Sequence, residues 1–406
     1  MKMLLMYSRI GLRNIRRNVR RSLFTIVAVS FGLFCLIVFE ALKVGLHHEM
    51  LHSTLNLDAA AIQVHAVGFE QNLAMLQPLP QPAEVEKQLA AAGITHFAAR
   101  IKSPALVLAG KRSSSVLLAG VMPEQEKEVT FVADKITAGT YLAEPGTLLI
   151  GQVLADSLRV GLGDEVTLMV QSMFGRPAAR KFTIGGMFRT ELASFDRNHL
   201  YLDLTTAQHF LDADGVITEI AIRTPPAKAA AAAEILQRRL GEAYQVRSWQ
   251  QNLPDLEQLI ELNDATMGLL VIIVFAIVAM GISNTMSTVI FERFREFGTL
   301  AAIGTPPRGI VALVVLESFF LGLLAAILGS LAGALACSLL ASHGLDLSRF
   351  TSANQYFAAG HVLKAYLLPG DLLLAVAVTL ATALLAGLYP AVKASRLEPV
   401  EALVHV

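Results

Sequence analysis

The sequence ISNTMSTVIFERFREFGTLAAIGTPPRGI, residues 282–310, places a short charged segment between two long apolar runs. One apolar run begins at Met267 and the other at Val311, and each is long enough to span a bilayer. Four charged residues of the segment fall within about one turn of helix. They are Glu292, Arg293, Arg295 and Glu296. A charged cluster in this position predicts contact with something outside the lipid.

Glycine and proline residues indicate where this segment turns back. Gly298 and Gly304 follow the charged cluster, and two consecutive prolines at 306–307 cannot continue a helix without a break. We therefore expect residues 291–310 to form a compact charged hairpin at one face of a membrane. The alternative is an ordinary loop with solvated charges, and the surrounding sequence has to decide between the two.

The composition indicates a chain that is part membrane and part water-exposed. Of the 406 residues, 54% are hydrophobic and 16% are charged, with a mean hydropathy of +0.54. The formal net charge is zero, so no overall basic character points to nucleic acid. Cys35 and Cys337 both fall in apolar runs and predict neither a disulfide framework nor a metal site.

The N-terminal region predicts an uncleaved membrane anchor. Residues 1–21 contain seven Lys and Arg residues and no acidic residue. The first predicted span, residues 22–44, is longer than the apolar core of a signal peptide and lacks a small-residue cleavage site. Basic residues beside a span are typical of the cytoplasmic side and of lipid-headgroup contact, which we favour over nucleic-acid binding.

Three more apolar runs give a 1+3 arrangement of membrane helices. A loop at 342–369 is poor in basic residues, whereas the tail at 390–406 carries Lys393 and Arg396. Both termini are therefore expected inside the cytoplasm. The three further predicted spans are residues 264–290, 311–341 and 370–389.

Residues 45–263 are predicted to form a water-exposed α+β domain. Alternating strands are interspersed with short helices and one alanine-rich helix. His48 and His52 form the single i, i+4 pair among three clustered histidines, so we favour a solvated helix over a metal site. Gly110 and Lys111 lack the upstream glycine of a phosphate-binding loop, and no catalytic motif is identified.

Several residues of the spans are candidates for packing or coupling. Asn284 belongs to a polar notch with neighbouring Ser and Thr residues, and interhelical hydrogen bonding is the favoured explanation. Glu317 lies inside a span and is expected to pair with this notch. Gly329 and Gly333 form a GxxxG pair that allows close approach of helices. A single helix from Pro254 to the hairpin, about 36 residues or 54 Å long, exceeds the bilayer core and predicts a stalk.

The charged hairpin also carries a family resemblance. Its pattern RxREFGxLxAIG, from Arg293 to Gly304, resembles the cytoplasmic coupling segment of FtsX-like permeases, the membrane subunits of MacB-type and LolC/LolE-type ABC transporters. The start GLRNIRRNVRRSLFTI at 11–26 and the tail YPAVKASRLEPVEAL at 389–403 resemble the same family. The resemblance covers nearly the whole chain.

The resemblance implies a fold and a division of labour. It implies an α-helical membrane protein of the bacterial inner membrane with a MacB-type periplasmic α+β domain, whose inserted β-rich part is expected near 123–214. A separate ABC ATPase, two copies per complex, would dock on Glu292, Arg293, Arg295, Glu296, Gly298 and Gly304. ATP and magnesium would be bound by that ATPase, and this chain would bind no cofactor and would not itself be an enzyme. A second permease copy or a related permease, membrane lipids and a periplasmic carrier or adaptor are the further partners implied.

The resemblance leaves several functions open. IQVHAVGF at 62–69, GDEVTLMV at 163–170 and RKFTIGGMF at 180–188 look most like the LolC/LolE group, which implies extraction of lipoproteins or other lipidic cargo. The loop at 172–179 is shorter than the one with which that group recruits its carrier. MacB-like efflux of small molecules or peptides and FtsX-like control of cell-wall hydrolases are the alternatives. A membrane-anchored sensor, which needs no ATPase, is the alternative outside transport.

Overall fold

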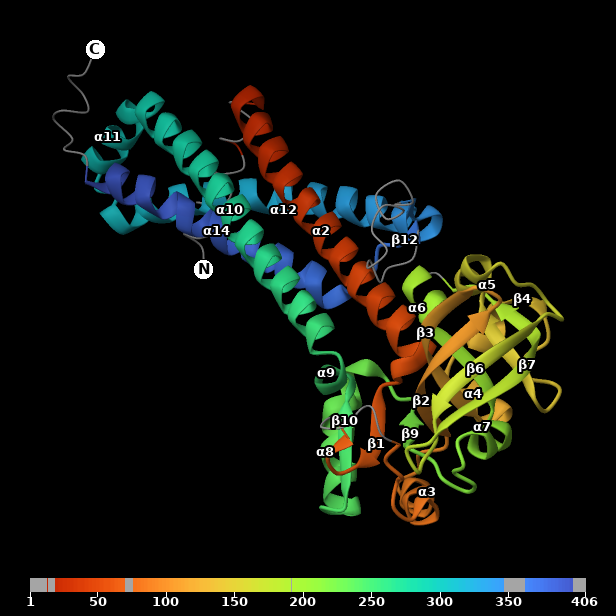
Figure 1. Ribbon diagram of the computed structural model, residues 1–406. Coiled ribbons are helices and arrows are strands. Elements are labelled where there is room, and N and C mark those ends of the chain that lie inside the picture. Colours follow the sequence, from red (N-terminus) through yellow and green to blue (C-terminus); the bar gives the residue numbers. More distant parts are fainter. Residues whose placement is uncertain (1–12, 14–18, 70–75, 191, 347–361, 397–406) are drawn as a thin grey trace. The chain divides into compact units, whose positions relative to one another are not determined.

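The computed structural model describes residue 13 and residues 19–69, 76–190, 192–346 and 362–396. The chain divides into two compact units, shown in Figure 1. A helical unit comprises residues 1–46, 260–345 and 363–406, and an exposed domain comprises residues 47–259 with 346–362. Most of the predicted basic N-terminus and the last ten residues of the tail lie outside the described residues.

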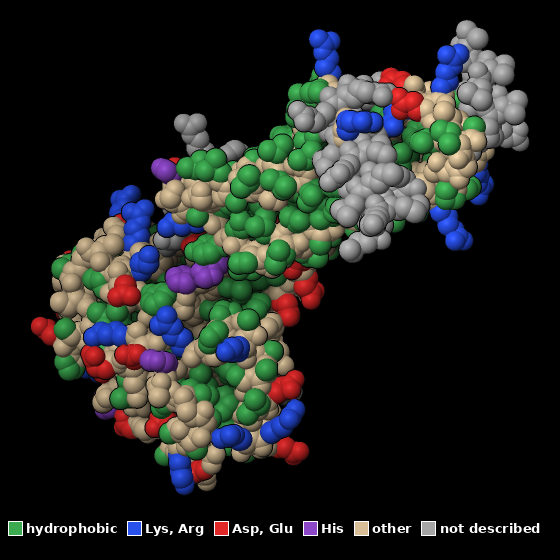
Figure 2. All heavy atoms as spheres, turned by 180° about the vertical axis from the view of Figure 1, so that it is seen from behind, with side chains coloured by type: hydrophobic (Ala, Val, Ile, Leu, Met, Phe, Trp, Pro, Cys, Tyr) green, Lys and Arg blue, Asp and Glu red, His purple; other side chains and the backbone are tan. Residues whose placement is uncertain are grey.

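Four helices of the described chain are long and apolar enough to cross a membrane. Leucine, alanine and other good helix formers dominate them, and their outward faces are covered by hydrophobic side chains (Figure 2). All four contain the predicted spans and extend beyond them at one or both ends. They are α2 (Val19–Thr54), α10 (Pro254–Glu292), α12 (Pro307–His343) and α14 (Pro369–Ser395).

The helix that was expected to form a stalk is continuous. α10 runs for 39 residues from Pro254, which occupies a helix start where its missing N–H costs nothing. At the standard rise, this length is about 58 Å, roughly twice the thickness of a hydrocarbon core. The predicted loop at 342–369 contains two short paired strands, β11 (Leu345–Asp346) and β12 (Val362–Leu363).

The exposed domain is built on a split βαββαβ unit. Its four strands follow the order β10-β1-β9-β2, and every neighbouring pair is antiparallel. Helices α3 (Pro82–Ala91) and α8 (Ala229–Leu240) connect the strands. The strands are β1 (Ile62–Ala66), β2 (Phe97–Ala109), β9 (Glu219–Ile222) and β10 (Tyr244–Ser248).

A closed barrel is inserted between β2 and β9. Its strands pair in the ring β2-β3-β8-β5-β7-β6 and back to β2, while β4 (Ile136–Gly139) extends from β7. Closure removes the free edges of these strands and encloses an apolar core that includes Ile101, Leu148 and Leu200. The remaining barrel strands are β3 (Arg112–Val121), β5 (Thr147–Gly151), β6 (Glu165–Gln171), β7 (Pro177–Phe188) and β8 (His199–Asp203).

The barrel corrects the predicted limits of the insertion. β3 begins at Arg112 and pairs in parallel with β8, so the inserted part begins about ten residues before the predicted boundary at 123. The second half of β2 also belongs to the barrel, because it pairs with both β3 and β6. Short helices surround or connect these strands. They are α4 (Pro123–Val129), α5 (Gln152–Leu158), α6 (Ala193–Asn198) and α7 (Leu204–Phe210).

Candidate coupling sites

The charged hairpin folds as a short helix between two long ones. After α10 ends at Glu292, α11 (Phe294–Ala302) follows almost at once. Gly304 adopts a φ of +91° beyond the end of α11, and the Thr305 N–H donates to the Leu300 carbonyl at 2.9 Å. This six-residue closure is the Schellman arrangement, which favours glycine at the left-handed position. Pro307 then begins α12, so the turn predicted from Gly304 and the two prolines is present.

Arg293 forms a buried ion pair at the base of the hairpin. Its side chain is 7% exposed, and its Nη1 donates to Oε2 of Glu317 on α12 at 3.1 Å. Its Nε donates to Oε2 of Glu296 at 2.7 Å, and its guanidinium lies 5.1 Å from the centre of the Phe297 ring. Arg293 therefore holds α11 against α12 and is turned into this chain rather than toward a partner. Its predicted role as a docking contact is not supported by this position.

Apolar packing also fixes the hairpin. Phe297 is 1% exposed and packs with Ile310 and Leu313 of α12 and Ala391 of α14. Gly298, which was expected to let an ATPase approach, is itself buried in this chain. Its predicted role in docking stays a prediction. A charged segment followed by glycine looks like a surface turn in sequence, and tertiary packing decides otherwise.

A different set of side chains remains on the surface of the hairpin. Glu292, Arg295 and Gly304 are exposed, and Glu296 is half-buried beside Arg293. Sequence reasoning missed two apolar members of this surface, Phe291 at 59% exposed and Ile303 at 77% exposed. The local signal was available, because both are large hydrophobic residues flanking the charged cluster. A mixed charged and apolar surface of this kind is suited to binding another protein.

The polar notch connects two helices, as expected, whereas Glu317 has a different partner from the one predicted. Thr285 of α10 shares a 2.9 Å hydrogen bond with Thr25 of α2, so the notch does connect helices. Asn284 is exposed at the surface of α10. Glu317 is 5% exposed and forms an ion pair with Arg293. The sequence had predicted that it pairs with the polar notch.

The GxxxG pair of α12 lies against α2. A Cβ added to Gly329 would lie 2.7 Å from the Ser30 carbonyl oxygen, and one added to Gly333 would lie 3.0 Å from the Ile37 side chain. Ser30 also donates its hydroxyl to the Ala325 carbonyl at 3.0 Å. The two glycines therefore let the backbones of α2 and α12 approach closely, as small residues do between membrane helices.

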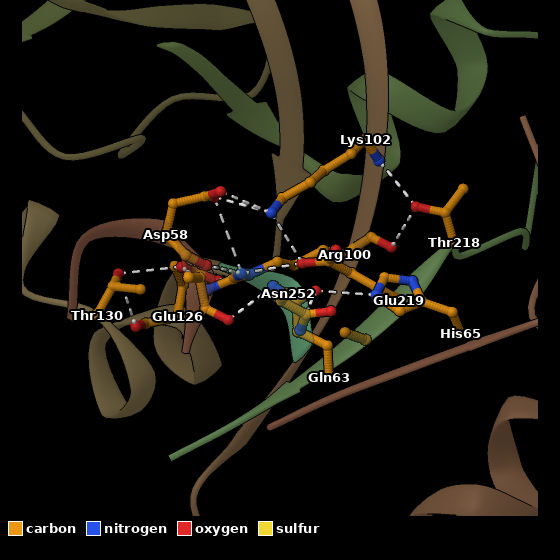
Figure 3. A network of polar contacts seen from close by, with 12 residues as sticks. Asp58, Gln63, His65, Arg100, Lys102, Glu126, Thr130, Thr218, Glu219 and Asn252 are labelled. Carbon is orange, nitrogen blue, oxygen red and sulfur yellow. Dashed lines mark hydrogen bonds and ion pairs between the residues drawn. The ribbon is translucent and has the colours of Figure 1, made fainter. Parts of the chain in front are cut away.

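A second buried arginine organises the exposed domain (Figure 3). Arg100 of β2 is 1% exposed and donates two hydrogen bonds to the Glu126 carboxylate, at 2.9 and 2.7 Å. Its Nη1 reaches Glu219 of β9 at 2.9 Å and the Asp58 carbonyl at 2.7 Å. Thr130 donates to Glu126 at 3.0 Å, which supports the bidentate pair. The arginine thus connects β2, β9 and α4 with the chain that follows α2.

Lys102 and Asp58 extend this network. Lys102 Nζ lies 2.8 Å from the Asp58 carboxylate and 3.0 Å from Glu219. Burial alone would raise the pKa of Asp58, but the charges of Lys102, His199 and Arg100 outweigh it and hold the pKa well below its ordinary value. Asp58 therefore remains ionised at neutral pH. It belongs to a π-helical turn, Leu55–Ala59, that directly continues α2.

The segment that leads into α10 is tied to the same region. Asn252, the last residue of α9 (Trp249–Asn252), donates to the Gln63 side chain at 3.0 Å. Gln63 in turn contacts His65 at 2.9 Å and donates to the Ala59 carbonyl at 2.6 Å (Figure 3). The segments adjoining α2 and α10 are therefore joined through one polar network. Sequence gave no signal for it, because its members come from distant strands and turns.

These features define a class of protein. It is a membrane subunit with a charged hairpin at one end of its long helices. Polar networks fix the extensions of these helices in an exposed α+β domain. The chain belongs to the FtsX-like, MacB-type family of ABC transporter permeases. The MacB-like periplasmic core domain matches residues 22–239, and the FtsX-like permease C-terminal domain matches residues 268–399. Four apolar helices and relatives of the LolC and MacB type indicate a bacterial inner-membrane protein, and these relatives are ABC transporter permeases that work with an ATPase.

Individual relatives show which members of the family this chain resembles over its full length. The chain is 26% identical over 97% of both chains to the lipoprotein-releasing system transmembrane protein LolC of Xylella fastidiosa. It is 24% identical to LolC of Neisseria meningitidis, over 97% of this chain and 98% of that one. The macrolide export ATP-binding/permease protein MacB of Bordetella avium is 27% identical over 66% of this chain and 40% of its own length. The similarity to LolC thus spans the whole architecture.

Proposed function

We propose that this chain couples ATP hydrolysis by a separate ATPase to conformational work of its exposed domain, and that the work is the release of lipoproteins from the inner membrane. The observation that carries the coupling proposal is the hairpin anchored by Arg293 and Glu317. Because α11 is fixed to α12 and α14, a force applied to its exposed residues acts on the membrane helices directly. The continuous α10 provides a stiff element along the chain toward the exposed domain.

The docking surface is assigned to Glu292, Arg295, Phe291 and Ile303, which are exposed on the hairpin. ATP and magnesium are bound by the ATPase, and two copies of it are expected to serve a pair of permease subunits. The pair is either two copies of this chain or this chain with a related permease. The basic residues that flank the spans support an assignment of both termini, and hence of the hairpin, to the cytoplasm.

Substitution of the docking surface tests the coupling proposal. Arg295→Ala combined with Ile303→Ser should reduce co-purification of the ATPase at least tenfold, because a charged and an apolar contact are lost together. Arg238→Ala, at an exposed position of α8, is the matched control and should leave co-purification unchanged. If the ATPase is retained at an unaltered hydrolysis rate by the hairpin variant, it docks elsewhere.

The orientation is tested by labelling with an impermeant thiol reagent. A cysteine at Ser114 should react in cells whose outer membrane is permeabilised, whereas one at Ser395 should react only after the inner membrane is opened. Cys35 and Cys337 are first replaced by serine. The reverse pattern would contradict the proposed orientation.

The similarity to LolC over the whole chain supports lipoproteins as the cargo. An apolar cavity in the helical unit, lined by Leu36 of α2, Phe275 of α10 and Leu372 of α14, offers space for part of an acyl chain. ATP-dependent release of a purified lipoprotein from vesicles that contain the complex is the direct assay. Release that is equal with and without ATP would exclude this cargo.

One feature favours MacB-like efflux as the second candidate. The connection between β6 and β7 is a tight turn in which the Ser172 N–H donates to the Arg176 carbonyl at 2.7 Å. Such a short turn offers little surface for recruitment of a carrier, apart from the exposed ring of Phe174. Export of small molecules or peptides by vesicles that do not release lipoproteins would establish this alternative.

A further inference from the structure

A cavity of about 420 Å³ opens in the exposed domain beside the end of α2. The last turns of α2, the start of β1, the end of α4 and the chain after β9 form its walls. Apolar residues including Leu51, Leu55 and Val129 make up much of the lining. Polar side chains gather in the remainder: His48, His52, Asn56, His96 and Arg223.

One wall is held in place by ring stacking. The Phe131 ring lies 5.2 Å from the His52 ring and 4.7 Å from the Arg223 guanidinium. The His48 and His52 rings stack with a separation of 5.9 Å. The Phe131 N–H donates to the Asn56 carbonyl at 2.8 Å, which anchors this ring to the end of α2. The imidazole and guanidinium groups are thus positioned without a ligand.

Among the described residues that line the cavity, Arg223 is the one with a fixed charge, and three histidines accompany it. His96 pairs with Glu128 at 3.0 Å, and Arg223 donates to the Glu128 backbone carbonyl at 3.3 Å. None of the described residues that line the cavity is acidic. In the described chain, no group of three His, Cys, Asp or Glu residues is placed to hold a metal ion. An array of N–H donors around an apolar cavity suits an anion with an attached apolar part.

The position along the chain indicates which anion. The predicted span ends at Val44, and His48 and His52 follow it by four and eight residues on the same helix, α2. This closeness in sequence to a membrane span favours the phosphate of a lipid.

We propose that this cavity is a binding site for a phosphate group, with Arg223, His52 and His48 as the phosphate ligands. The phosphate belongs to a membrane lipid or is free in solution, and the chemistry of recognition is shared. Arg223 supplies a fixed charge and a planar donor pair, while the imidazoles supply directional N–H groups. This binding is independent of the cargo and of ATPase docking.

The fluorescence of Trp249 can report ligand binding in the cavity. It is the single tryptophan of the chain, and its indole N–H donates to the carbonyl of Pro226, a residue that lines the cavity, at 3.1 Å. The full-length protein in detergent is titrated with dihexanoylphosphatidylglycerol, with dihexanoylglycerol and with inorganic phosphate. Fluorescence of Trp249 and calorimetry follow binding. We expect saturable binding of the phospholipid and none of the uncharged lipid at the same concentrations.

Variants identify the ligands of the phosphate. His52→Gln combined with Arg223→Gln should weaken phospholipid binding at least tenfold, because charged hydrogen bonds are lost. His48→Gln alone should cause a smaller loss. His209→Gln combined with Arg176→Gln, at residues that do not line the cavity, is the matched control and should bind as the unaltered protein does. Circular dichroism verifies that each variant is folded.

The outcomes separate the alternatives. Binding of inorganic phosphate as tight as that of the phospholipid would support the phosphate site and assign it to a soluble ligand. Equal binding of both lipids, or unchanged binding by the double variant, would overturn the proposal. Zinc binding that is lost in His48→Gln combined with His52→Gln, without any response to phosphate, would also overturn it, because the histidines would then serve a metal.

Discussion

Two buried arginines organise the two units of this protein, and they are held very differently. Arg100 contacts Glu126, Glu219 and the Asp58 backbone, with Lys102 beside them, so its partners come from several separate elements. Arg293 has one partner three residues away, Glu296, and one on the next helix, Glu317.

The difference indicates what each site can do. The surroundings of Arg100 are enclosed on all sides, and its carboxylate partners Glu126 and Glu219 are at most 2% exposed. Breaking one contact there leaves several buried charges without compensation, so the arrangement acts as a rigid frame. At Arg293 the Glu296 side chain is 39% exposed, and water can replace that contact when the hairpin moves. The frame fixes the helix extensions, whereas the hairpin site fixes the surface that we propose transmits force.

The largest effect is expected when the frame loses its central cation. Arg100→Met should destabilise the exposed domain by about 3–5 kcal/mol, because Glu126 would remain buried without a cation and Glu219 would keep only Lys102 as its partner. Thermal unfolding of the full-length protein, followed by the fluorescence of Trp249, measures this loss. Arg238→Met, whose side chain is 79% exposed in its pair with Glu234, should change stability by less than about 1 kcal/mol. Equal effects of the two substitutions would mean that the network does not stabilise the domain.

A smaller, local effect is expected at the hairpin. Glu317→Leu should weaken the attachment of α11 by about 2 kcal/mol, because Arg293 would keep only its half-exposed partner. Trypsin cleavage after Arg293 and Arg295 should then become about ten to thirty times faster, since local opening exposes these bonds. Combining Glu317→Leu with Arg293→Met removes the cleavage site at 293, so protection is followed at Arg295, where most of it should be restored because an apolar pair replaces the ion pair. Cleavage that is as slow in the single variant as in the unaltered protein would contradict the anchoring role.

The smallest effect concerns a buried carboxylate that is held by hydrogen bonds. Thr190 donates its N–H and its hydroxyl to Asp196, at 3.0 and 2.6 Å, yet burial raises the pKa of Asp196 to about 6. The folded protein therefore binds a proton more readily than the unfolded chain does, so Asp196 makes stability fall as the pH rises from about 4 to 6. Asp196→Asn should remove a change of about 1 kcal/mol per pH unit over this range. Denaturant unfolding at pH 4.5 and 6.5 tests this, and an identical pH profile for the variant would assign the dependence to another group.

The sequence predicted the features that depend on neighbouring residues. The four spans, the long α10 and the turn at Gly304 follow from apolar runs, the absence of internal breakers and a backbone position that suits glycine. The burial of Gly298 was not predicted, because glycine after a charged cluster has the same local pattern on a surface turn and in a packed helix. The start of the inserted barrel was also misplaced, because membership of a barrel depends on which strands pair.

By itself, the sequence therefore predicted four apolar helices long enough to span a membrane, a large exposed α+β domain and a resemblance to the FtsX-like permeases. Only the tertiary structure decided which charges are paired. Arg293 and Glu317 are 24 positions apart, and Arg100 and Glu219 are 119 apart. Hydrophobic periodicity specifies which face of a helix or strand is apolar, but it does not specify the neighbour on which that face packs. Ion pairs across such contacts form only when packing fixes both partners, because desolvation has to be offset by well-aligned hydrogen bonds.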